Sequence, residues 1–170
     1  STLEAADAIE TLATAGLDMN EIIGGAAEAT VLLSNASGGD FSQSAEIMTD
    51  SMAIFTDSIS SYQDAVNGVI SVSNASKFTV DDYALALAQA GGIAGTVGVE
   101  FDDFNTSIAA ISPLFASGSD AGTSYKTMLQ RLVPSTNPAV GAMRDLGLFA
   151  GLTDKEFEKT QSTIAKYQTQ

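Results

Sequence analysis

The 170-residue sequence contains no cysteine, no histidine and no tryptophan. The absence of cysteine excludes disulfides and thiolate metal sites. The absence of histidine removes the commonest general base and transition-metal ligand. Its apolar residues are mainly Ala, Ile, Leu and Val, a mixture that favours tightly packed helices over an aromatic-rich β-sandwich. From these absences we predict a non-enzymatic helical protein.

Basic side chains are scarce along most of the chain. Up to Tyr125 there are 17 acidic residues and a single basic one, Lys77, whereas from Lys126 onward six basic residues accompany four acidic ones. The two parts carry −16 and +2, which together give the net charge of −14. An acidic surface repels the phosphate backbone, so we expect no sequence-specific binding of nucleic acid. Solubility is the simplest role for such acidity.

Capping residues mark where helices begin. Three pairs have the spacing of a capping box, in which a side chain at the helix start and an acidic residue three positions later exchange hydrogen bonds: Asp18 with Glu21, Thr79 with Asp82, and Thr153 with Glu156. Further caps are expected at Asp40, at Asp102, and at Ser119 or Asp120. Glycine or proline ends the helices between them, with breaks expected at Gly16, Gly98, Gly118, Pro134 and Gly147.

Apolar residues recur at three- and four-residue steps throughout, and no stretch shows sustained two-residue alternation. Residues 66–72 are rich in valine and are also compatible with a strand, but Gly68 and the spacing favour a helix. The predicted fold is all-α, a compact array of about seven to nine helices. We divide it into a helical core domain at residues 1–150 and a C-terminal helix at residues 151–170 that leads into the rest of a longer chain.

The sequence also contains a weak internal echo. Residues 15–21 resemble residues 97–103, and residues 33–40 resemble residues 114–120, a separation of about eighty residues. Either two related helical hairpin units or chance similarity in a chain rich in Ala, Ser and Gly explains it.

Three patterns invite a chemical interpretation. The adjacent carboxylates Asp81-Asp82 and Asp102-Asp103 lie at expected helix starts, where capping explains them better than acid–base catalysis. The glycine-rich residues 90–98 lack the Gly-Lys-Ser/Thr ending of a phosphate-binding loop. A Ser–Lys pair using Lys77 or Lys126 stays formally open, but no Ser-x-x-Lys motif supports it. We therefore expect no catalytic residue, no cofactor-binding residue and no metal ligand.

The longest uncharged run covers residues 83–99, which is at the short limit for crossing a bilayer. A buried core helix is the preferred interpretation, and insertion into a membrane is the alternative. Gly91, Gly95 and Gly98 are expected on one face of this helix, where small residues let another helix approach closely.

Residues 121–132, AGTSYKTMLQRL, carry a family resemblance. They are similar to the Ala-Gly-Thr…Met-Leu-x-Arg-Leu signature in the core region of phage tail tape measure proteins. Residues 134–148, which contain Ala-Met-Arg-Asp-Leu-Gly, resemble the element that follows it, and residues 84–111 and 15–18 also fit. The resemblance covers roughly residues 5–147, with Tyr125 in place of a usual aliphatic residue and Ser112-Pro113 interrupting a helix that is often smoother.

The resemblance implies a structural segment that takes part in tail assembly, tail-length determination and genome ejection. It implies as partners other copies of the chain, the tail tube protein, tail tip or hub proteins and tail assembly chaperones. It implies a location in the virion tail, in the tube lumen or at the tip, and in the host cytoplasm during assembly. Two alternatives stay open: a membrane-active segment of a DNA-delivery channel that contacts the membrane during ejection, and an accessory domain of a tail-associated cell-wall hydrolase.

Overall fold

The computed structural model describes residues 2–38, 40–132, 141–143 and 146. Within these residues the chain is all-helical, with no strand, as predicted. The elements are α1 (Thr2–Thr14), α2 (Met19–Glu21), the π-helical turn η1 (Ile22–Ala26), α3 (Ala27–Ser37), α4 (Phe41–Ile54), α5 (Tyr62–Ala75), α6 (Val80–Thr96), α7 (Phe101–Ile111), the 3₁₀ turn η2 (Ser112–Leu114) and α8 (Gly118–Leu132). The valine-rich residues 66–72 lie inside α5, so the helical interpretation of that stretch is confirmed.

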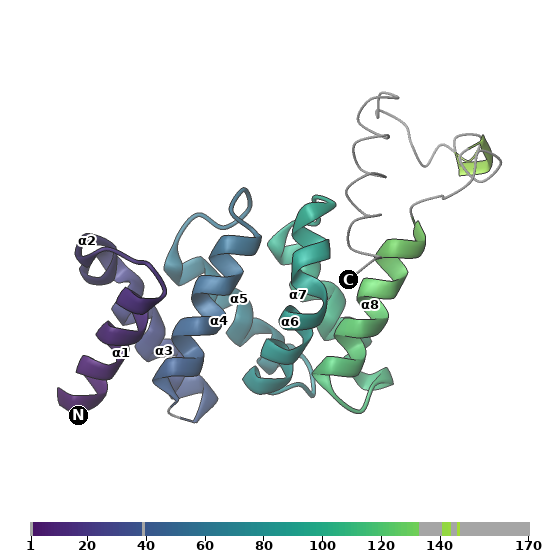
Figure 1. The fold of residues 1–170 in the computed structure, drawn as a ribbon. Helices are drawn as coiled ribbons and strands as arrows, with labels where there is room; N and C mark the ends of the chain where they lie inside the picture. Colours follow the sequence, from purple (N-terminus) through teal and green to yellow (C-terminus); the bar gives the residue numbers. More distant parts are fainter. Residues whose placement is uncertain (1, 39, 133–140, 144–145, 147–170) are drawn as a thin grey trace.

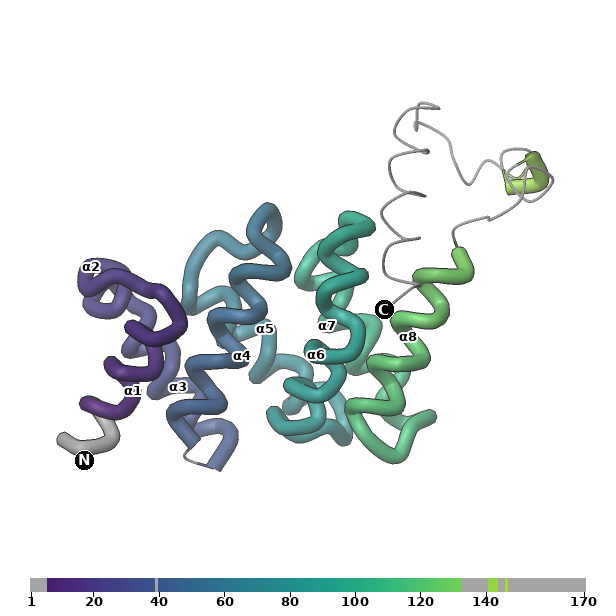
Figure 2. Tube along the Cα trace, viewed as in Figure 1, coloured from purple at the N-terminus to yellow at the C-terminus, as the bar shows by residue number. Residues whose placement is uncertain are grey.

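The helices form an array of two layers (Figure 1). Helices α1, α4, α6 and α8 lie side by side in one layer, and α3, α5 and α7 lie behind them in the second. The Cα trace in Figure 2 runs from the α1 end of this array to the α8 end without returning. The core is continuous along the array, from Leu12 in α1 to Leu129 in α8. Each helix contacts helices that are close to it in the chain, both within its layer, as α6 with α8, and between the layers, as α3 with α4. The array therefore follows the order of the sequence from one end to the other.

The capping residues that start the helices are partly as expected. Asp18 with Glu21, and Thr79 with Asp82, both form complete capping boxes, and the Asp40 carboxylate accepts a hydrogen bond from the backbone N–H of Gln43. These three predictions are confirmed. Each satisfies backbone N–H groups that would have no partner at a helix start.

Two caps were predicted at the wrong residue. Helix α7 begins at Phe101, and its cap Glu100 makes no side-chain cap hydrogen bond, so Asp102 lies inside the first turn. Helix α8 is capped by Ser117, whose hydroxyl accepts from the N–H of Asp120, rather than by Ser119 or Asp120. Helix α7 begins earlier than predicted because Phe101 is buried in the core, so tertiary packing overrides the local capping signal. Helix α8 begins earlier because Ser117 and Asp120 have the spacing of a cap, a local signal that the prediction missed. The caps and breaks predicted at Thr153, Pro134 and Gly147, and the division at residue 150, lie outside the described residues.

Part of the internal echo has a structural counterpart. Helices α1 and α6 both end with a left-handed glycine, Gly16 and Gly98, with φ of 97° and 80°. In both, the residue after the glycine donates its N–H to a carbonyl five positions earlier, Leu17 to Leu12 and Val99 to Ala94. This is the Schellman arrangement that closes a helix C-terminus. The two turns are therefore alike, while the relation between two whole hairpin units stays a prediction.

Helix α4 packs closely against two glycines of α6. A Cβ atom on Gly91 would lie 2.9 Å from Ile54 Cδ1, and one on Gly95 would lie 2.5 Å from the Ile54 carbonyl oxygen. The predicted close approach is confirmed for these two residues. It is wrong for Gly98, which ends the helix and has open space around it.

Candidate functional site

The helix that contains the AGTSYKTMLQRL segment is α8, and one face of it is buried. Gly118, Ala121, Gly122, Tyr125 and Leu129 are its buried residues, at steps of three and four, so they form a single stripe along the helix. This stripe faces α6, and α6 with α8 is the most extensive helix pair in the array. The residues that carry the resemblance therefore build a helix crossing inside the fold.

The crossing depends on the absence of side chains at two positions. A Cβ atom on Gly118 would overlap the backbone carbonyl of Asp82. A Cβ atom on Gly122 would lie 2.7 Å from the carbonyl oxygen of Ala86 and 2.9 Å from its Cα. Backbone thus meets backbone along one side of α8, a closeness that only glycine permits.

Asp82 joins the two helices by hydrogen bonds. One carboxylate oxygen accepts from the backbone N–H of Gly118 at 3.1 Å. The other accepts from the N–H of Thr79 at 3.2 Å and from its hydroxyl at 3.1 Å. One side chain therefore completes the start of α6 and satisfies the first N–H of α8.

The electrostatics of Asp82 follow from these contacts. Partial burial alone would raise the pKa of the carboxyl, but the hydrogen bonds from Gly118 and Thr79 and the nearby Lys77 ammonium outweigh it, and the pKa is lowered. Lys77 in turn donates to the backbone carbonyl of Phe115. Lys77 is thus bonded to the backbone just before α8, and among the described residues it makes no bond to a serine hydroxyl that would support a Ser–Lys pair.

A pH-dependent loss of stability should follow. A carboxyl whose pKa is depressed by folding stabilises the fold above its unfolded pKa, and this contribution is lost as pH falls through the folded pKa. We expect Asp82→Asn to lower the free energy of unfolding at neutral pH by roughly 0.5–1 kcal/mol. The difference from wild type should shrink as pH falls below the ordinary carboxyl range, measured by urea unfolding across pH.

Asp81→Asn is the matched control for this prediction. It removes a carboxylate from the same first turn of α6, but the Asp81 side chain is exposed and the bond to Gly118 remains. If the two variants lost the same free energy of unfolding at every pH, the contact between Asp82 and α8 would contribute nothing to stability.

Aromatic side chains fill the centre of the array beside this crossing. The Phe104 ring lies 5.3 Å from Phe55, 6.2 Å from Tyr83 and 5.7 Å from Tyr125, measured between ring centroids. The last two contacts are edge-to-face, a favoured geometry for aromatic pairs. Residues of α6 and α8, and Phe55 at the end of α4, therefore meet on one ring of α7.

Two polar side chains inside this centre are joined by a hydrogen bond. The Tyr83 hydroxyl donates to the side-chain oxygen of Asn105 at 2.8 Å, and both side chains are buried. Complete burial raises the pKa of the Tyr83 phenol, with Ser51 opposing the rise, so Tyr83 stays a neutral donor. The Asn105 amide nitrogen has no hydrogen-bond partner and lies against Gly68 of α5. Because Tyr83 and Asn105 are buried and joined by a hydrogen bond, this pair has a structural role.

The surface hollows offer little to chemistry. A shallow groove between α1 and α4 is lined by Asp7, Glu10 and Glu46 together with small polar residues, and all its charged groups are acidic. The carboxylate pairs at residues 81–82 and 102–103 lie in the first turns of α6 and α7, where sequence reasoning placed them. Within the described residues no group of three metal-ligating side chains gathers, and no helix is long and apolar enough to cross a bilayer. Residues 83–96 belong to α6, one face of which is buried in the core while the other is exposed, so the preferred interpretation as a core helix holds for one face.

The sequence profile of the phage-related minor tail protein family matches residues 1–167 of this chain. The chain belongs to this family. It is also similar to the tape measure protein of Pneumococcus phage Dp-1, with 28% identity over 148 residues, which is 87% of this chain and 13% of the relative. The chain thus spans about an eighth of the length of that curated relative. No solved structure matches it.

The resemblance to tape measure proteins is thereby confirmed, together with a structural role in the phage tail. Its signature residues 121–132 coincide with α8, and the crossing they form was not itself predicted. The pairing of Gly118 and Gly122 with Asp82 and Ala86 joins positions 36 residues apart, a distance over which helical periodicity gives no signal. The glycine spacing of four residues was the available hint.

Proposed function

We propose that this segment is a folded, non-catalytic module of a tail tape measure protein that serves in tail assembly, length determination and genome ejection. The observation that carries the proposal is that one face of the family signature is used for internal packing. Ala121, Gly122, Tyr125 and Leu129 are buried and pack α8 into the array, so this face of the signature maintains the fold. A motif used in this way supports a scaffold role in the tail, the setting given by the family.

The partners we propose are those of a tail scaffold: other copies of the chain, the tail tube protein, tip or hub proteins and assembly chaperones. The acidic surface supports contacts with proteins over sequence-specific contacts with DNA. The proposed location is the tube lumen or tip of the virion tail, and the host cytoplasm during assembly.

The test is an in-frame deletion of these 170 residues from the parent gene, with tail length measured by electron microscopy. A continuous helix of this length would rise at most about 255 Å, at about 1.5 Å per residue. Because the helices lie side by side in the array, we expect the tails to shorten by clearly less than this limit.

A parent protein carrying Gly118→Ala is the control, since it keeps the chain length but disturbs the fold. If the point variant gave tails of normal length and the deletion gave shorter tails, tail length would depend on the length of the chain and not on its fold. Normal tails from the deletion would contradict a role in length determination and assembly together.

A further inference from the structure

Large apolar side chains are exposed almost entirely at the two ends of the array. Helices α4, α5 and α7 expose none among the described residues, and α6 exposes only Leu85. The end formed by α1, α2, η1 and α3 exposes Ile9, Met19, Ile23, Val31 and Leu32, and the other end exposes Leu114, Met128 and Leu132, while Leu146, later in the chain than α8, is exposed as well. Terminal units of helical arrays usually carry a polar outer face, so apolar ends indicate surfaces that a partner covers.

On α3 the exposed face combines apolar and acidic groups. Val31 and Leu32, each 40% exposed, follow Glu28 by three and four residues and therefore share its side of the helix. The opposite side, with Ala29, Thr30 and Leu33, is buried. This α3 face is thus two aliphatic side chains next to a carboxylate.

On α8 the exposed face has the complementary charge. Met128 and Leu132, 46% and 53% exposed, lie one turn apart with Arg131 beside them. These three residues and Thr123, Ser124 and Thr127 line a shallow hollow on the helix. Arg131 and Lys126 are two of the three basic residues in the described part of the chain, and the third, Lys77, is bonded to the Phe115 carbonyl. The α8 face is therefore two apolar side chains next to a guanidinium.

We propose that the α8 face of one copy docks on the α3 face of a second copy. Each face offers two apolar side chains and one charge, and the charges are opposite, so Arg131 of one copy pairs with Glu28 of the next. A symmetric dimer through either face alone would place like charges together, which is unfavourable. The contact is heterologous and joins opposite ends of the array, so each copy can bind two others, and the copies form a ring or an open row according to the rotation between them. It deepens one part of the proposed function, the association with other copies of the chain.

Charge exchange tests the contact directly, using sedimentation velocity of the 170-residue chain at low ionic strength. Arg131→Glu alone and Glu28→Arg alone should each weaken self-association about tenfold or more, because each places like charges at the interface. An equal mixture of the two variants should associate again, since a reversed α8 face meets a reversed α3 face and the two unchanged faces meet each other. Rising salt should weaken the wild-type association.

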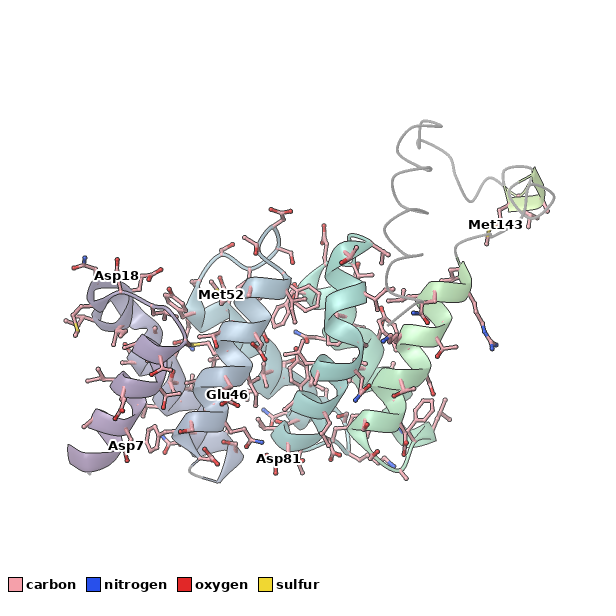
Figure 3. All side chains as sticks on the ribbon, in the orientation of Figure 1. Asp7, Asp18, Glu46, Met52, Asp81 and Met143 are labelled. Atoms are coloured by element: carbon pink, nitrogen blue, oxygen red, sulfur yellow. The ribbon has the colours of Figure 1, made fainter. Side chains whose placement is uncertain are left out.

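Two control variants separate the contact from general effects. Glu46→Arg changes the net charge as much as Glu28→Arg does, but Glu46 lies on α4 in the middle of the array (Figure 3), so association should be unchanged. Leu85→Asp alters an apolar side chain as exposed as Met128 but on α6, and only Met128→Asp should disrupt association.

Three outcomes would overturn the inference: a wild-type chain that stays monomeric at all concentrations, a Glu28→Arg variant that associates normally while Arg131→Glu does not, or a mixture that fails to recover. The second outcome would show that the α8 face is covered by something other than α3 of another copy. None of these bears on tail length in the deletion phage, so the failure of this inference and of the proposed function are distinguishable.

Discussion

Gly118→Ala should destabilise the protein by about 3 kcal/mol, the upper end of the usual cost of overpacking. The added methyl group would occupy the position of the Asp82 backbone carbonyl, and a backbone group has no alternative rotamer to adopt. Helix α8 would have to move away from α6, which would also lengthen the hydrogen bond from the Gly118 N–H to the Asp82 carboxylate. Urea unfolding followed by far-ultraviolet circular dichroism measures the loss.

Gly92→Ala provides the matched comparison. Gly92 lies within α6, has no positive φ and has no atom within 4 Å of an added Cβ. The same substitution there should stabilise the protein by up to about 1 kcal/mol, because alanine is the better helix former. Two Gly→Ala substitutions of opposite sign would confirm the crossing, whereas stabilisation by both would mean that α8 lies further from α6.

Phe104→Ala should cost about 3–5 kcal/mol, the range for removing a fully buried aromatic side chain. The Phe104 ring contacts Tyr83 of α6, Tyr125 of α8 and Phe55 just after α4, so the cavity would open at the junction of both layers. Because the loss approaches the whole stability of a typical domain, we expect a large fall in the urea midpoint or an unfolded chain at ambient temperature.

Leu114→Ala is the comparison for this second variant. Leu114 lies in η2 and is 79% exposed, so its truncation should change stability by no more than about 0.5 kcal/mol. A small effect at Phe104 as well would mean that the aromatic centre is not the core of the array.

The fold class followed from periodicity and capping because both signals are local. Asp18, Asp40 and Thr79 cap helices as expected, since their partners are two or three residues away in the sequence. The cap of α7 was misplaced because Phe101 belongs to the helix and is buried in the core, where a tertiary contact competes with the local signal. The cap of α8 was missed although Ser117 and Asp120, three residues apart, carry a local signal for it.

The crossing itself was beyond sequence reasoning. Gly91 and Gly95 were recognised as contact positions from their spacing, but the partner, Ile54 of α4, could not be deduced. Gly118 was interpreted as a break between helices, although it is the first residue of α8 and the closest point of approach to α6. A single sequence shows that a glycine is present and not which backbone occupies the space it leaves.

The order of the helices along the array determines how the fold would yield to a pulling force. Helix α1 has no substantial contact with α6, α7 or α8 among the described residues, so detaching it leaves the α6–α8 crossing intact. Tension on the N-terminal end would thus remove one helix after another instead of breaking the whole structure at once, as expected for a quasi-one-dimensional array. Such a chain can be extended in successive small steps, each opposed by the contacts of one helix with its neighbours, and it can shorten again as each helix returns to them.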